Sequence, residues 1–550
     1  MGQVISSENI QKEHTIHTSI GSITGEILTS SLTKNASTVR YSRIPYALPP
    51  VGDLRWKKPV SMPNDHDYTG KYTTNGLLSY QPVRNIELNQ HEKDNLVINF
   101  PKPTEYTENI TYLNIFTPTG EAPKEGWPVY VYLHGGLLQN GDPVKFNPIE
   151  MFDVFGAVDE KFILVVPGYR INLFGFLGSD YLKAQKDGGA NFGYWDQRES
   201  LKWVYKNIEH FGGDKEKVTC GGLSAGANSA FYQMLYEKYH PEEEQIIKRL
   251  VLNSNVVWHV PRESSEAQYQ ELLNKLDLTG ETEEEKFEKL KSIDPDVLVK
   301  TIPKLSITTF RGILDHDFIS DKYVQDLVSG DLSNWMKEKD LKFIIGEVAN
   351  EGWLYSIANT PKTVGELESR LVEFYRQELV QPLLESYDIN EDLSLDELKF
   401  RYGQIIGDGQ TRYASRGFIG QVINTGFPLE NIWRYKEEFM NQFVRQFIKD
   451  ESFGLIHGFD INLWFHHEGI YSKEEIPKLR RFVRPIVDFL AYRDHKEAVN
   501  GIGYDGEYPW RNNKADYFNL LNSNGDVVYV KDEEWERGLG VAQKVYKAQL

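Results

Sequence analysis

The chain has 550 residues, of which 40% are hydrophobic and 26% charged, a composition typical of a folded globular protein with a large core. Eighty acidic and 61 basic residues give a net charge of −19, which disfavours phosphate backbones and excludes nucleic acid as an expected partner. The lone cysteine, Cys220, excludes an internal disulfide and indicates a reducing compartment.

The first residues carry a lipidation pattern. Met1, Gly2 and Ser6 satisfy the N-myristoylation motif once the methionine is removed. A frayed terminus that happens to begin with Met-Gly is the alternative, because no basic cluster follows and one myristoyl chain binds membranes only marginally. The sequence shows neither a basic-then-apolar signal peptide nor an apolar run of roughly 20 residues. We expect a cytoplasmic protein with, at most, weak membrane association through Gly2.

Short β-rich runs alternate with helical patterns along the chain. Five runs are too compact and β-branched for amphipathic helices, at 129–134, 162–166, 217–222, 249–254 and 342–346. Residues 196–211 form a helical pattern, with Leu201, Val204 and Ile208 at helical spacing. This alternation predicts an α/β protein with a large, mixed but mostly parallel central sheet covered by helices on both faces.

Two charged helical regions interrupt the alternation, at about 261–341 and about 363–449. Neither is bounded by a flexible linker, so we interpret both as helical insertions around one sheet. Although the chain exceeds the usual domain size, we therefore expect a single domain over residues 1–550.

The segment "VTCGGLSAGANSA" runs from a strand into small residues suited to a helix start. Gly222, Ser224 and Gly226 match the G-x-S-x-G pattern, in which a strained strand-to-helix turn exposes a nucleophilic serine. Glycines are needed because the serine backbone passes close to its neighbours. An ordinary Gly/Ser turn is the alternative. The segment "HGGLLQNGD" begins at His134, at the end of the strand at 129–134. It favours the nucleophile interpretation, because hydrolases with this serine turn place oxyanion donors after such a strand.

Longer segments carry a family resemblance. They are "YSRIPYALPPVGDLRWKKP" at 41–59, "ENITYLNIFTP" at 108–118 and the block at 189–226 that ends at the nucleophile motif. The chain resembles the type-B carboxylesterase/lipase family, the cholinesterase-like branch of the α/β hydrolases. The resemblance implies the α/β-hydrolase fold and ester hydrolysis without a metal or an organic cofactor.

The resemblance also implies a catalytic set. The family's acid lies in a G-x-x-x-x-E-G segment, which corresponds to Glu351 in "GEVANEG", and its histidine lies in G-x-x-H-G-x-E, which corresponds to His457 in "GLIHGFD". With Ser224 they would form a Ser-His-Glu triad. The oxyanion donors would be the backbone amides of Gly136, Leu137 and Ala225. Alternatives to the triad partners are a nearby glutamate and two neighbouring histidines, Glu347, His466 and His467.

Three positions depart from the family pattern. Leu137 replaces the third glycine of the oxyanion loop, so its backbone must accept a side chain beside the substrate. Leu223 stands where a glutamate commonly precedes the serine, which removes a negative charge and argues against choline esters. Phe100 falls near the family's choline-binding tryptophan, and the alternative is an aromatic that simply lines an apolar pocket. We expect Leu223 and Phe100 to be substrate-binding residues.

The leading interpretation is a serine carboxylesterase that hydrolyses uncharged, fairly apolar small-molecule esters through an acyl-enzyme. A lipase for long-chain acyl esters is the nearest enzymatic alternative. A non-catalytic interaction protein is the alternative of another class, because this fold also hosts catalytically inactive relatives. Interfacial activation would indicate the lipase, and failure of Ser224 to react with a serine-directed phosphonate would indicate the interaction protein.

Overall fold

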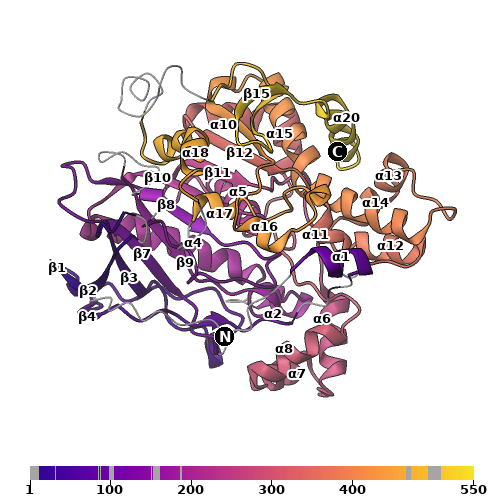
Figure 1. The fold of residues 1–550 in the computed structure, drawn as a ribbon. Helices are drawn as coiled ribbons and strands as arrows, with labels where there is room; N and C mark the ends of the chain where they lie inside the picture. The colour runs from indigo at the N-terminus through magenta and orange to yellow at the C-terminus, as the bar shows by residue number, and fades with distance from the viewer. Residues whose placement is uncertain are drawn as a thin grey trace.

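The computed structural model describes residues 12–30, 33–83, 86, 88–97, 105–149, 151–152, 161–185, 189–358, 360–465, 472–493 and 510–550. Within these ranges, one 13-stranded sheet runs through the molecule (Figure 1), in the order β1-β2-β3-β7-β9-β8-β10-β11-β12-β13-β14-β15, with β4 paired to β2. Its strands are β1 Lys12–Thr18, β2 Gly21–Leu28, β3 Thr38–Pro45, β4 Gly70–Lys71, β7 Tyr112–Pro118, β8 Trp127–Leu133, β9 Ile163–Pro167, β10 Gly213–Leu223, β11 Ile247–Asn253, β12 Lys342–Val348, β13 Ile432–Glu437, β14 Tyr517–Leu521 and β15 Val527–Lys531.

The middle of the sheet is parallel. Strands β9, β8 and β10 to β14 pair in parallel, whereas β1, β2, β3 and β7 at one edge and β15 at the other pair antiparallel. The five runs predicted from the sequence form β8 to β12 within a few residues of the expected bounds. The prediction of a mixed, mostly parallel sheet is therefore confirmed.

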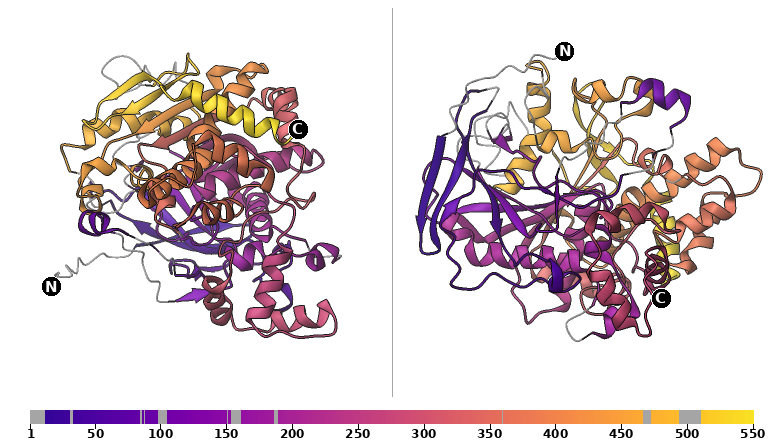
Figure 2. Two further views of the ribbon diagram at one scale, coloured as in Figure 1. Left: turned by 90° about the vertical axis from the view of Figure 1, so that its right-hand side faces the viewer. Right: turned by 90° about the horizontal axis from the view of Figure 1, so that it is seen from below.

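Helices cover both faces of the sheet because its central strands are apolar on both sides. On β8, Val129, Val131 and Leu133 face one core cluster, and Tyr130 and Tyr132 face the other, as the two-residue period of a strand requires. The first cluster is completed by helices α4 (Phe192–Asn207), α5 (Ala225–Tyr239), α15 (Tyr413–Asn424) and α20 (Trp535–Lys547). The second is completed by α18 (Ile476–Leu490). Figure 2 shows these helices on either side of the sheet.

The two charged regions supply helices outside this core. The first contains α6 (Glu266–Lys275), α7 (Glu283–Lys291), α8 (Pro295–Thr301), α9 (Tyr323–Ser329) and α10 (Asp331–Glu338). The second contains α12 (Val364–Leu371), α13 (Gln377–Ser386), α14 (Leu395–Gly407) and α15. Helices α6 to α8 and α12 to α14 form two protrusions, at the bottom and at the right of Figure 1.

The predicted extent of the second region, to about residue 449, is wrong at its end. Ile432–Glu437 is strand β13, which pairs with β12 and β14 inside the sheet. Ile432, Trp433 and Tyr435 are buried there. This short segment is therefore a strand because its β-favouring side chains pack inside the folded protein. The single domain stays a prediction.

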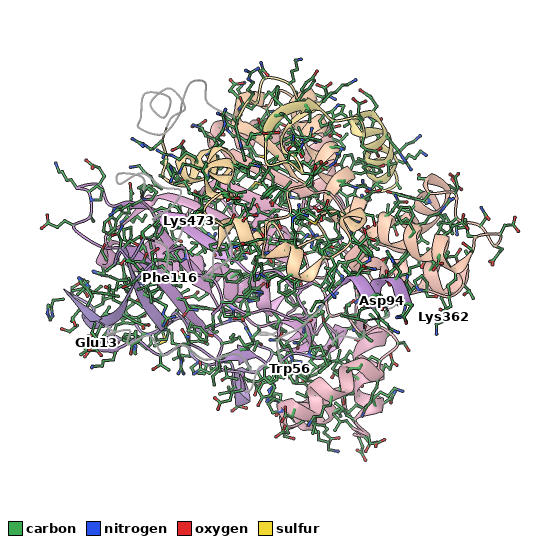
Figure 3. All side chains as sticks on the ribbon, viewed as in Figure 1. Glu13, Trp56, Asp94, Phe116, Lys362 and Lys473 are labelled. Atoms are coloured by element: carbon green, nitrogen blue, oxygen red, sulfur yellow. The ribbon has the colours of Figure 1, made fainter. Side chains whose placement is uncertain are left out.

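Side chains fill the space between the sheet and the helices, and charged side chains such as that of Lys362 lie at the rim (Figure 3). Within the described ranges, the helices do not combine the length and apolarity that crossing a bilayer requires. Gly2, for which lipidation is predicted, lies outside the described residues.

Candidate active site

Ser224 occupies a sharp turn between β10 and α5, with φ at 58° and ψ at −123°. This backbone conformation is rare for a residue with a side chain and costs of order 1–3 kcal/mol, which points to a functional constraint. A Cβ on Gly222 would lie 2.2 Å from the carbonyl oxygen of Leu133, and one on Gly226 would lie 1.9 Å from the same oxygen. Both flanking positions therefore need glycine, as the motif predicts.

The loop after β8 packs directly on this turn. A Cβ on Gly135 would lie 2.6 Å from the carbonyl oxygen of Leu223 and 3.3 Å from Cβ of Ser224. Two sequence motifs about 90 residues apart thus meet in space, as the sequence predicts. The contact places the expected oxyanion donors next to the serine.

Three backbone amides beside Ser224 are free to bind a ligand. The N–H groups of Gly136, Leu137 and Ala225 donate no hydrogen bond to any residue that the structure describes. Leu137 adopts a φ of 60°, so the loop keeps the left-handed turn even though a leucine replaces glycine. Because Ala225 is the first residue of α5, its amide also lies at the positive end of a helix dipole. Amide donors without an acceptor beside a nucleophile suit a developing oxyanion.

His134, which begins this loop, is a packing residue. Its ring stacks on Tyr169 at a centroid distance of 4.2 Å, and its Nδ1 donates to the carbonyl oxygen of Gly135 at 3.1 Å. Burial lowers the pKa of His134 to about 4. The imidazole is therefore neutral at physiological pH and holds the loop against the core.

Glu351 and His457 come from the loops that follow two neighbouring strands, β12 and β13. Oε2 of Glu351 accepts a hydrogen bond from Nδ1 of His457 at 2.5 Å. Oε1 of the same carboxylate accepts from the Ser254 hydroxyl and from the Val348 amide, both at 2.8 Å. The His457 amide donates in turn to the Asn350 carbonyl at 3.1 Å. The carboxylate is thus fixed by three donors and itself fixes the imidazole.

The second ring nitrogen of His457 is left available. Nε2 is buried and has no hydrogen-bond partner within the described part of the chain, the Ser224 hydroxyl included. The loop that carries His457 nevertheless adjoins the nucleophile turn, because a Cβ on Gly458 would lie 3.8 Å from Cδ2 of Leu223. Hydrogen bonds between nucleophile and base are often long in free enzymes and shorten when substrate binds.

The structure separates Glu351 from its sequence neighbour Glu347. Glu347 is buried and pairs with Arg416 at 2.8 and 3.1 Å. Burial alone would raise the pKa of Glu347, but the charge and hydrogen bonds of Arg416 outweigh it and leave the pKa lowered. Glu347 therefore belongs to a structural ion pair. His466 and His467 lie outside the described residues.

Leu223, one of the two predicted substrate-binding residues, does not line the described cavity. Leu223 packs in the second core cluster, and its side chain is not part of the cavity wall. The sequence position before the nucleophile thus contributes to the core. Phe100 lies outside the described residues.

Two buried carboxyl groups near the triad were not singled out from the sequence. Burial raises the pKa of Asp460 to about 7, with a further contribution from the negative charge of Glu351. Burial also raises the pKa of Glu437, and the charge of Asp460 adds to this effect. Tyr435 donates a hydrogen bond to Asp460 at 3.2 Å. The sequence offered one signal for Asp460, which occupies the last position of the family's histidine motif.

A cavity opens beside the serine. Ser224, Ala225 and Leu137 form part of its wall, together with aromatic residues that include Trp258 and Phe374. Within the described residues, no group of three or more His, Cys, Asp or Glu side chains could hold a metal ion. The arrangement can bind a small organic molecule with a carbonyl carbon next to the serine.

Known proteins resemble this chain along nearly its whole length. The family model described as "Carboxylesterase family" matches residues 12–534. An uncharacterized esterase/lipase of Schizosaccharomyces pombe is 36% identical over 517 residues, and the alignment covers 92% of this chain and 92% of its own. A carboxylic ester hydrolase of Gibberella moniliformis is 31% identical over 540 residues, covering 95% of this chain and 94% of its own. The crystal structure of Aspergillus niger EstA aligns with a TM-score of 0.73 at 19% identity, covering 99% of this chain and 100% of that chain, and so shares the fold.

Proposed function

The chain belongs to the carboxylesterase family and is a carboxylic-ester hydrolase with the α/β-hydrolase fold, and on this premise we propose that Ser224, His457 and Glu351 are its catalytic triad. The observation that carries the assignment is the 2.5 Å hydrogen bond from Nδ1 of His457 to Glu351, which leaves the buried Nε2 without a partner among the described residues. A neutral imidazole held in this tautomer is a general base.

In the proposed reaction, Nε2 of His457 removes the hydroxyl proton of Ser224 as the oxygen attacks the ester carbonyl carbon. The carbonyl oxygen becomes an alkoxide that the free amides of Gly136, Leu137 and Ala225 stabilise. His457 then protonates the departing alcohol. Water hydrolyses the acyl-enzyme by the same route and regenerates the serine.

The cavity supports an apolar substrate body. The indole of Trp258 and the ring of Phe374 belong to its wall, and such surfaces bind hydrocarbon and aromatic groups. Two guanidinium groups, those of Arg262 and Arg311, belong to the same wall. The preference for uncharged esters stays a prediction, and these two cations favour a substrate that also carries a negative charge.

The test compares wild type with Ser224→Ala on 4-nitrophenyl esters of rising chain length. We expect the substitution to lower kcat by about 10⁴–10⁶-fold, because the acyl-enzyme cannot form. Ser229→Ala is the matched control, since Ser229 is a buried serine further along α5 whose hydroxyl donates to the Ala225 carbonyl. The control should stay within about threefold of wild type.

Covalent labelling gives a second readout. A serine-directed phosphonate should modify wild type and Ser229→Ala at Ser224 and leave Ser224→Ala unmodified. Full activity in Ser224→Ala, or labelling of another serine with loss of activity, refutes the assignment. A rate that rises steeply only above the solubility limit of long-chain esters indicates the lipase alternative.

A further inference from the structure

Two arginine side chains line the cavity without a hydrogen-bonded acid among the described residues. Arg311 and Arg262 both line the cavity that reaches Ser224. Arg311 is partly buried, and its Nε and Nη2 atoms are fully buried with no hydrogen-bond partner among the described residues. Nε of Arg262 is likewise buried with no hydrogen-bond partner among the described residues. Nη2 of Arg262 donates to the neutral side-chain amide of Gln268 at 3.2 Å. Buried guanidinium groups are normally paired with anions, so both lack the partner that burial usually requires.

The acid in the same wall is already engaged. Glu373 accepts hydrogen bonds from Nη1 of Arg370 at 2.9 Å and from the Thr309 hydroxyl at 3.0 Å. Its negative charge is therefore shared among Arg370, Arg311 and Arg262, which leaves the region with an excess of positive charge.

The other titratable groups in the described cavity wall add no negative charge, since burial raises the pKa values of Tyr194, Tyr232 and Tyr375. His259 donates from Nδ1 to the Val260 carbonyl at 3.0 Å, and burial lowers its pKa to about 4, so its imidazole is neutral. Burial lowers the pKa of Arg262, and the positive charge of Arg311 lowers it further. Guanidinium groups in proteins nevertheless stay protonated. The cavity thus presents two cations to whatever enters it.

The backbone around Arg311 is fixed to the loop that carries the free amides. The side chain of Gln139, two residues after Leu137, exchanges hydrogen bonds with both backbone groups of Phe310, at 2.6 and 2.9 Å. The side chain of Asn191 does the same for Ile313, at 2.8 and 3.0 Å. Arg311 therefore sits between two clamped neighbours, at a position that is set relative to the catalytic machinery.

The Arg311 guanidinium lies over an aromatic ring. Its central carbon lies 4.0 Å from the centroid of the Phe374 ring. A guanidinium is planar, and its N–H groups can form two parallel hydrogen bonds to a carboxylate. The site therefore combines a positioned cation, an excess of positive charge and a cavity that leads to the nucleophile.

We propose that the natural substrate is an ester that carries a carboxylate, and that Arg311, with Arg262 beside it, binds that carboxylate in the cavity next to Ser224. This inference rests on the proposed function. The carboxylate belongs either to the acyl half, as in a half-ester of a dicarboxylic acid, or to the alcohol half, as in an ester of a hydroxy acid. Hydrolysis proceeds through Ser224 in both cases, and Arg311 supplies recognition.

The test uses two matched substrate pairs with wild type and Arg311→Met, which keeps the apolar bulk of the side chain. Mono-4-nitrophenyl adipate against 4-nitrophenyl hexanoate places the carboxylate on the acyl half. Acetate esters of 4-hydroxybenzoate and of 4-methylphenol place it on the alcohol half. We expect wild type to have the higher kcat/KM for the carboxylate member of one pair, which identifies the half.

In Arg311→Met, kcat/KM for that carboxylate ester should fall about 10- to 100-fold, mainly through KM, because a hydrogen bond to a charged group is lost. The value for its neutral partner should change less than threefold. Arg311→Lys should recover part of the loss, and Arg537→Met, an exposed arginine on α20, should resemble wild type.

Equal kcat/KM ratios in wild type and Arg311→Met for both pairs would overturn the inference. So would an equal loss on neutral and charged esters, which would make Arg311 a structural partner of Glu373. Failure of the triad assignment is distinguishable, because it appears as activity in Ser224→Ala on the neutral esters and does not depend on the ratio within a pair.

Discussion

Replacing Glu351 with glutamine tests whether the carboxylate sets the tautomer of His457. Two donors, the Ser254 hydroxyl and the Val348 amide, point at Oε1 from 2.8 Å. A glutamine side chain must therefore place its carbonyl oxygen there and its NH₂ group toward Nδ1 of His457. Nδ1 then has to accept a hydrogen bond, which moves the ring proton to Nε2. An Nε2 that carries a proton cannot remove one from Ser224.

The expected loss in kcat/KM is about 10⁴-fold, the size of the effect when a triad acid is exchanged for its amide and the histidine adopts the wrong tautomer. It corresponds to about 5 kcal/mol of lost transition-state stabilisation. The assay is release of 4-nitrophenol from a neutral ester at pH 8, with the thermal midpoint measured on the same samples to establish that the variant is folded.

Glu347→Gln is the matched control, because Glu347 lies four residues earlier and its carboxylate pairs with Arg416. We expect this variant to have a lower thermal midpoint, since a buried charge pair is weakened, and kcat/KM within about threefold of wild type below that midpoint. A loss below tenfold in Glu351→Gln, or a larger loss in Glu347→Gln than in Glu351→Gln, would refute the reasoning.

Two further predictions concern packing and pH. Gly226→Ala should give insoluble or inactive protein, because its Cβ would lie 1.9 Å from the Leu133 carbonyl oxygen. Gly365→Ala, whose Cβ would meet no atom within 4 Å, should raise the thermal midpoint slightly. Equal thermal midpoints for Gly226→Ala and Gly365→Ala would contradict this prediction. Burial and the charge of Glu351 raise the pKa of Asp460 to about 7, so the folded chain holds a proton there that the unfolded chain loses near pH 4. The free energy of unfolding of wild type should thus fall relative to Asp460→Asn as pH rises from about 4 to 7, and a constant difference in thermal midpoint over that range would count against the shift.

Local backbone chemistry explains why part of the site could be predicted. The nucleophile turn requires glycine at two positions beside Ser224, and that requirement is visible in five consecutive residues because the contacts recur wherever the turn forms. The five central strands were also predictable, because a buried parallel strand is apolar on both faces. By contrast, Ile432–Glu437 was missed, since a short run with three charged residues becomes a strand only by pairing with β12.

The sequence by itself therefore determined the fold class, the family resemblance and the triad candidates. The tertiary structure gave Glu351 and Glu347 their different partners, because both are buried glutamates near the end of one strand, and His457 and Arg416 lie 106 and 69 residues further along the chain. Only the tertiary structure placed Arg311 in the cavity beside Ser224. A side chain's charge is written in the sequence, but whether an opposite charge meets it depends on distant segments that folding brings together.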